Sequence, residues 1–75
     1  MHKLPILSGK EVINALTKIG FREIRQKGSH VILKKQTDTG EVGCVVPLHK
    51  EIAVGTLKGI LKQAAVSPDE LINNL

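Results

Sequence analysis

The chain has 75 residues, a formal net charge of +4 and a single cysteine. A chain this short buries only about 60% of the surface that its unfolded form exposes, so we expect residues 1–75 to form one domain of modest stability. One cysteine excludes a disulfide framework and fits a reducing compartment, and no stretch is apolar for long enough to be a signal peptide or a membrane span. We therefore expect a cytoplasmic protein with no membrane partner.

The first predicted helix covers residues 9–19. Ser8 and Glu11 have the spacing of a capping box, in which each side chain bonds the backbone N–H of the other residue. Apolar residues then recur at helical spacing, and Gly20 supplies the left-handed conformation that ends many helices. A strand with a weak apolar pattern follows over 21–26.

The chain then alternates between a turn at 27–29, a strand at 30–35, a turn at 36–40 and a strand at 41–46. Gly28 tolerates the positive φ that a tight hairpin often needs. Residues 31–33 are all apolar, so alternation does not show which face of the second strand is core. Cys44 lies in an apolar run and is expected to be a buried, inert thiol, and Pro47 ends the third strand because proline has no N–H to donate. Three strands joined by short turns predict an antiparallel meander.

A second predicted helix has an apolar stripe at helical spacing, formed by Leu57, Ile60, Leu61, Ala64 and Ala65. Gly59 inside this helix costs up to about 1 kcal/mol relative to alanine, and we expect it to allow close packing on the sheet. Ser67 and Pro68 begin a short last helix. The order predicts an α+β fold of αβββα layout, with a three-stranded antiparallel sheet, helices on one face and a short C-terminal helix. Double-stranded-RNA-binding domains have the same layout, although a shared fold does not establish function.

The positive charge is concentrated in residues 22–35, which hold five basic side chains and one acid and so carry the whole net charge of +4. Such a segment is either a phosphate-binding face or a solvated hairpin whose charges discourage aggregation, and composition favours neither. With one Phe and no Tyr or Trp, the chain lacks aromatic platforms for bases. An RNA contact would therefore use phosphates, ribose hydroxyls and helix shape. The candidate RNA contacts are Arg22, Arg25, Lys27, Ser29, Lys34 and Lys35.

His30 is the candidate catalytic residue, because histidine on a rigid strand can exchange a proton near neutral pH amid these cations. On the residues alone, the commoner alternative is a half-exposed histidine that hydrogen-bonds only the turn. His49 is either a second acid or phosphate contact, or a solvated loop side chain. Ser29 either donates to phosphate or bonds its own backbone, and Gly28 serves the turn. No histidine and carboxylates lie at ligand spacing, so we expect neither a metal nor a cofactor.

Several short segments together resemble the HicA (YcfA-like) toxin family. In chain order they are Ser8-Gly9-Lys10-Glu11, Gly28-Ser29-His30, Pro47-Leu48-His49, Gly55-Thr56-Leu57 and Ile60-Leu61-Lys62-Gln63-Ala64. The resemblance implies a double-stranded-RNA-binding-like fold, a ribosome-independent mRNA interferase in which His30 is catalytic, and a HicB-type antitoxin that covers the active site. The chain departs from the family at Ala65, where glycine is common, and at 31–33, where an aromatic residue is common.

The resemblance therefore implies the toxin component of a type II toxin–antitoxin system, an endoribonuclease that cleaves mRNA, and the lack of ligand spacing favours cleavage without a metal ion. His30 would act as general acid or base while the ribose 2′-OH attacks its own phosphate. Two alternatives stay open. One is a non-catalytic RNA-binding module of the same fold, and the other is a protein-interaction domain whose open sheet face binds a partner.

Overall fold

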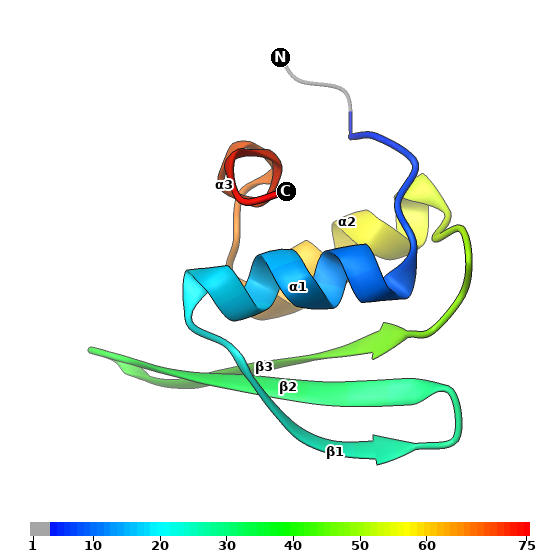
Figure 1. Cartoon of the computed structure of the whole chain (residues 1–75). Helices are drawn as coiled ribbons and strands as arrows, with labels where there is room; N and C mark the ends of the chain where they lie inside the picture. The colour runs from blue at the N-terminus through cyan, green and yellow to red at the C-terminus, as the bar shows by residue number, and fades with distance from the viewer. Residues whose placement is uncertain (1–3) are drawn as a thin grey trace.

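A computed structural model describes residues 4–75 as three helices and one sheet (Figure 1). The elements are α1 (Gly9–Ile19), β1 (Arg22–Lys27), β2 (His30–Thr37), β3 (Gly40–Pro47), α2 (Val54–Ala64) and α3 (Pro68–Asn73). The strands are antiparallel in the order β1-β2-β3, and the helices lie together on one side of the sheet (Figure 1). The predicted αβββα fold with a short C-terminal helix is confirmed. None of the helices in this range has the length and apolar character to cross a membrane.

The predicted signals place both ends of α1 correctly. The backbone N–H of Glu11 donates to Ser8 Oγ at 3.1 Å, and the backbone N–H of Ser8 donates to Glu11 Oε1 at 3.0 Å, which completes the capping box. Gly20 has φ 119 at the C-cap. The chain then reverses so that the backbone N–H of Phe21 donates to the Leu16 carbonyl at 3.0 Å, and both side chains are buried. The cap therefore directs the aromatic ring into the core.

Pairing along β2 decides which face of the sheet is core. Val31 and Leu33 are buried and pair with the buried Val46 and Cys44 of β3. Paired residues point to the same face, so these four side chains meet the helices. The residues between them, beginning with His30, point to the opposite face, which none of the helices α1, α2 and α3 covers (Figure 1). We call this surface the open face.

The apolar stripe of α2 packs against the sheet, with Leu57 and Ile60 buried. Ala65 does not belong to the stripe as predicted, because it is exposed and forms the C-cap of α2 at φ 57. This left-handed conformation favours glycine over residues with a Cβ atom. The prediction that Gly59 allows close packing on the sheet is also wrong, since a Cβ built there meets no atom of residues 4–75 within 4 Å.

The start of α1 packs directly on the backbone that follows β3. The Gly9 N–H donates to the His49 carbonyl at 2.9 Å, and a Cβ built at Gly9 would overlap the carbonyl oxygen of Pro47. The Leu48 N–H in turn donates to the Ser29 carbonyl in the β1–β2 turn at 2.7 Å. Backbone contacts thus connect α1, the loop after β3 and the turn before His30.

Cys44 is buried as predicted, and burial raises the pKa of its thiol from 9.0 to about 11. Because the thiolate is the reactive form, we expect a dithiodipyridine reagent at mildly alkaline pH to label Cys44 only as the chain opens. The unfolded thiol ionises at lower pH than the folded one, so the free energy of unfolding should fall as pH rises from 9.0 towards about 11. Native labelling as fast as in denaturant would contradict this expectation.

Candidate functional site

The open face gathers most of the predicted site residues. The pairs that β1 and β2 form on this face are Lys27 with His30, Arg25 with Ile32 and Arg22 with Lys34. The pairs that β2 and β3 form on it are His30 with Pro47, Ile32 with Val45 and Lys34 with Gly43. Four basic side chains therefore share one face with His30. Since β1 is an edge strand whose residues are all exposed, its basic side chains are open to a large ligand.

An irregularity in β1 brings Arg22 onto this face. The register shifts between Glu23 and Arg25, so that Ile24 lies outside the pairing, as in a β-bulge. In a regular strand, residues three positions apart point to opposite faces. The shift lets Arg22 and Arg25 both pair with open-face residues of β2. We name the four cations Arg22, Arg25, Lys27 and Lys34 the cationic patch.

The β1–β2 turn fixes His30 at the start of β2. Its two residues are Gly28, with φ 60, and Ser29, which is the arrangement of a type II′ hairpin. Gln26 Nε2 donates to the Gly28 carbonyl at 3.0 Å, and the Ser29 carbonyl accepts from Leu48. The imidazole of His30 is exposed and has no hydrogen-bond partner within residues 4–75. Hydrogen bonds thus fix the backbone before His30, while the imidazole itself is free to bind a ligand.

The sheet separates the two adjacent lysines of β2. Lys34 lies on the open face, where its Nζ is 3.3 Å from Glu41 Oε1, and about half of each side chain is exposed. An exposed pair of this kind contributes at most about 1 kcal/mol. Lys35 lies on the opposite face, where its Nζ is 5.9 Å from the centroid of the Phe21 ring, within reach of a cation–π contact. Lys35 is therefore not part of the cationic patch.

His49 lies outside the open face, on the loop after β3. Its side chain is exposed and lines a hollow of about 210 Å³ at the start of α1, together with Ser8, Lys10, Leu48 and Lys50. His30 lines a different hollow. Among residues 4–75, no three His, Cys, Asp or Glu side chains cluster as metal ligands would.

The hollow beside His30 is a groove of about 350 Å³ that residues of the sheet and of α2 line together. The sheet contributes His30, Val45 and Pro47, and α2 contributes Thr56, Gly59, Ile60 and Gln63. We call it the histidine groove. Sequence reasoning missed the polar residues of α2, because exposed helix positions carry no signal of what lies opposite them. The sequence offered one signal, because Thr56 and Gln63 lie within one helical turn of Gly59, a glycine in the interior of the helix.

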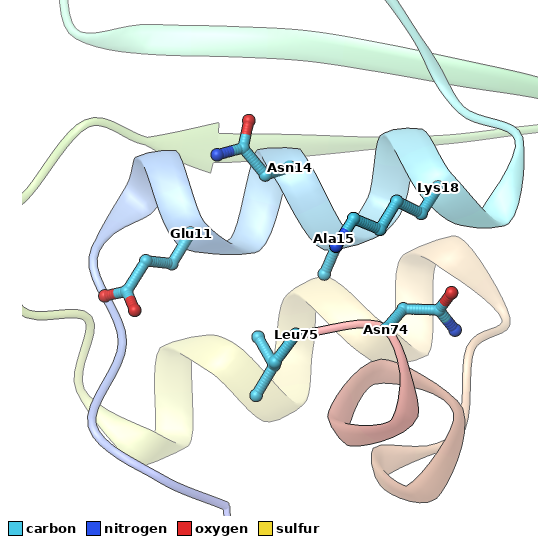
Figure 2. Close-up of a pocket in the computed structure, with 6 residues that line it drawn as sticks. All are labelled: Glu11, Asn14, Ala15, Lys18, Asn74 and Leu75. Carbon is cyan, nitrogen blue, oxygen red and sulfur yellow. The ribbon is translucent and has the colours of Figure 1, made fainter.

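Another hollow, of about 160 Å³, lies between α1 and the end of the chain. Figure 2 shows its lining residues, Glu11, Asn14, Ala15 and Lys18 of α1 and the C-terminal Asn74 and Leu75. The helices separate it from the open face (Figure 1), so it is no part of the site around His30.

The fold and the site together define the class of protein. It is an α+β domain of αβββα layout with a short C-terminal helix, and its open face presents an exposed histidine together with four cations. A family model described as HicA toxin of bacterial toxin-antitoxin matches residues 9–66, well over half of the chain. The chain therefore belongs to the HicA toxin family, as its motifs indicated, and this membership implies a toxin role and an antitoxin partner. No curated protein matches the chain.

Proposed function

We propose that the protein is an endoribonuclease that cleaves mRNA in the cytoplasm, with His30 as general acid or base. The observation that carries the proposal is the exposed imidazole of His30, which has no hydrogen-bond partner in the described part of the chain and lies beside the cationic patch. We further propose that the antitoxin is a HicB-type protein that covers this face. An inhibitor placed there would block both the histidine and the approach of a polyanion.

The chemistry needs only the substrate and a proton carrier. The ribose O2′ attacks the adjacent phosphorus, and the P–O5′ bond breaks to give a 2′,3′-cyclic phosphate and a 5′-hydroxyl. One group must accept the proton of the 2′-OH, and one must donate a proton to O5′ as it leaves. In the proposal, His30 carries out one of these transfers and water carries out the other. The protein's cations stabilise the negative charge that builds up on the phosphate oxygens.

Lys27 is the best placed of the cations for this role. It lies directly opposite His30 in the β1–β2 register. The Cβ atoms of directly opposite residues are about 5 Å apart, so an ammonium group and an imidazole can reach the same phosphate. The other members of the patch follow along β1 and β2, where they would hold neighbouring phosphates of the strand.

The experiment that tests this function uses purified toxin, freed of antitoxin, and RNA in a chelator. We expect fragments that end in a 2′,3′-cyclic phosphate and a 5′-hydroxyl, and no cut at a linkage whose 2′-OH is replaced by hydrogen. Cleavage at the deoxy linkage, or cleavage only with added metal, would contradict the mechanism. Binding without cleavage would favour the alternative, a non-catalytic RNA-binding module of the same fold.

Salt dependence tests the cationic patch separately from catalysis. Each phosphate contact to a single strand contributes about 0.7 to the slope of log affinity against log salt concentration. We expect Lys34→Ala to lower this slope by about 0.7, as measured by fluorescence anisotropy with a non-cleavable 2′-deoxy analogue. Lys35→Ala is the matched control, because the same residue type one position on lies on the other face. Equal slopes for the two variants would contradict the assignment.

A further inference from the structure

The histidine groove differs in chemistry from the cationic patch beside it. Among the described residues that line it, His30 alone can carry charge. Its walls are the apolar Val45, Pro47 and Ile60, and its other polar groups are an amide and a hydroxyl on α2. The imidazole of His30 lies on the border between the cationic patch and the groove, because His30 pairs with Lys27 of β1 on one side and with Pro47 of β3 on the other. A charged surface and an uncharged groove thus meet at one side chain. A nucleotide has the same division between its phosphate and its base.

Gly59 keeps the floor of this groove open. A glycine in a helix interior costs about 1 kcal/mol relative to alanine, and packing within the protein does not require this one. A Cβ built at Gly59 meets no atom of the described residues within 4 Å, although Gly59 lines the groove. Residues three or four apart lie next to each other on a helix, so a side chain here would stand between Thr56 and Gln63. The glycine therefore preserves space for something outside the chain.

The two polar groups of α2 that line the groove are available to a ligand. Neither the Thr56 hydroxyl nor the Gln63 amide has a hydrogen-bond partner in the described range 4–75, and both residues are exposed. A primary amide offers a donor and an acceptor side by side, which is the pattern that base edges require. The Thr56 hydroxyl can serve as a hydrogen-bond donor or as an acceptor.

We propose that the histidine groove binds one unstacked base of the nucleotide beside the scissile phosphate, and that Gln63 is a specificity-determining residue that reads its edge. The proposal rests on the ribonuclease function proposed above. A volume of about 350 Å³ is at the lower end of the range for small-ligand sites, so it suits a single base. The walls are aliphatic, so the base is held by hydrogen bonds and apolar contact, without aromatic stacking. Seating the base there would place the adjoining phosphate between His30 and the cationic patch.

The test fills the groove and removes the base in turn. Gly59→Leu places a bulky side chain in the groove, and Gly55→Leu is the matched control, because a Cβ at Gly55 also meets open space but Gly55 does not line the groove. The substrate is an oligonucleotide with one cleavable ribose linkage, made either with all bases or with an abasic residue beside that linkage. Both variants should melt at or above the temperature of the native chain, because leucine is the better helix former.

We expect the native protein to cleave the base-bearing substrate more than tenfold faster than the abasic one. Gly59→Leu should slow cleavage of the base-bearing substrate more than tenfold and slow cleavage of the abasic substrate much less, while Gly55→Leu changes neither rate. Gln63→Ala should change the preference among the four bases at that position. The proposal is overturned if Gly59→Leu slows both substrates equally, or if it behaves like Gly55→Leu.

A binding measurement separates this proposal from the ribonuclease function. In the His30→Ala variant, which keeps the remaining groove residues, affinity for the base-bearing oligonucleotide should exceed affinity for the abasic one. Gly59→Leu added to this variant should remove the difference. If the native protein cleaves nothing but this difference is present, the groove assignment stands and the ribonuclease function fails. If the affinities for the two oligonucleotides are equal, or neither binds, the groove assignment fails.

Discussion

Replacing His30 by alanine should slow RNA cleavage by about 10²- to 10⁴-fold, the usual contribution of a positioned general acid or base. The fold should remain intact, because the side chain is exposed and makes no hydrogen bond within residues 4–75, while the backbone of β2 keeps its pairing. Single-turnover rates on an oligonucleotide with one cleavable linkage measure the loss of cleavage. Thermal melting measures whether the fold remains intact.

His49→Ala is the informative companion to this variant. The His49 side chain lines a separate hollow at the start of α1, so we expect its removal to leave the cleavage rate close to that of the native protein. A loss as large as that of His30→Ala would instead assign His49 to the second proton transfer. A folded His30→Ala protein that cleaves RNA at the native rate would end the proposed mechanism, whatever His49 does.

Local signals predicted the helix and strand order well. The capping box at Ser8 and Glu11 and the left-handed Gly20 act within a few residues, so their effect can be seen in the sequence. The same locality explains the error at Ala65, since a second alanine after Ala64 gives no sign of which one ends the helix. The faces of β2 could not be assigned, because its three consecutive apolar residues fit either alternation.

The site depends on features that the sequence hardly signals. The irregularity near Ile24 moves Arg22 onto the open face, and nothing in the pattern of β1 indicates a bulge there. The histidine groove forms because α2 packs beside β3 and brings Gln63 near His30, residues that are far apart in the chain. The sequence indicated His30 and the positive charge around it. Which basic side chains share the open face with His30 follows only from the β1–β2 register.

Gly9→Ala should destabilise the fold by about 3 kcal/mol, the upper part of the usual range for overpacking. A Cβ at Gly9 would overlap the Pro47 carbonyl oxygen and lie 2.9 Å from Leu48 Cα, and both are backbone atoms that cannot rotate away. About 3 kcal/mol is a large share of the stability of a domain this small. Urea unfolding followed by circular dichroism measures the change.

Gly55→Ala is the control for that variant, since a Cβ at Gly55 has free space and alanine is the better helix former. It should be neutral or stabilising, and equal behaviour of the two variants would contradict the packing argument. The position also bears on function, because Pro47 pairs with His30 and Leu48 bonds the turn before it. Relieving the overlap at residue 9 must move α1 or this backbone. Gly9→Ala protein that remains folded should therefore cleave RNA more slowly than Gly55→Ala protein, although residue 9 lies outside the open face.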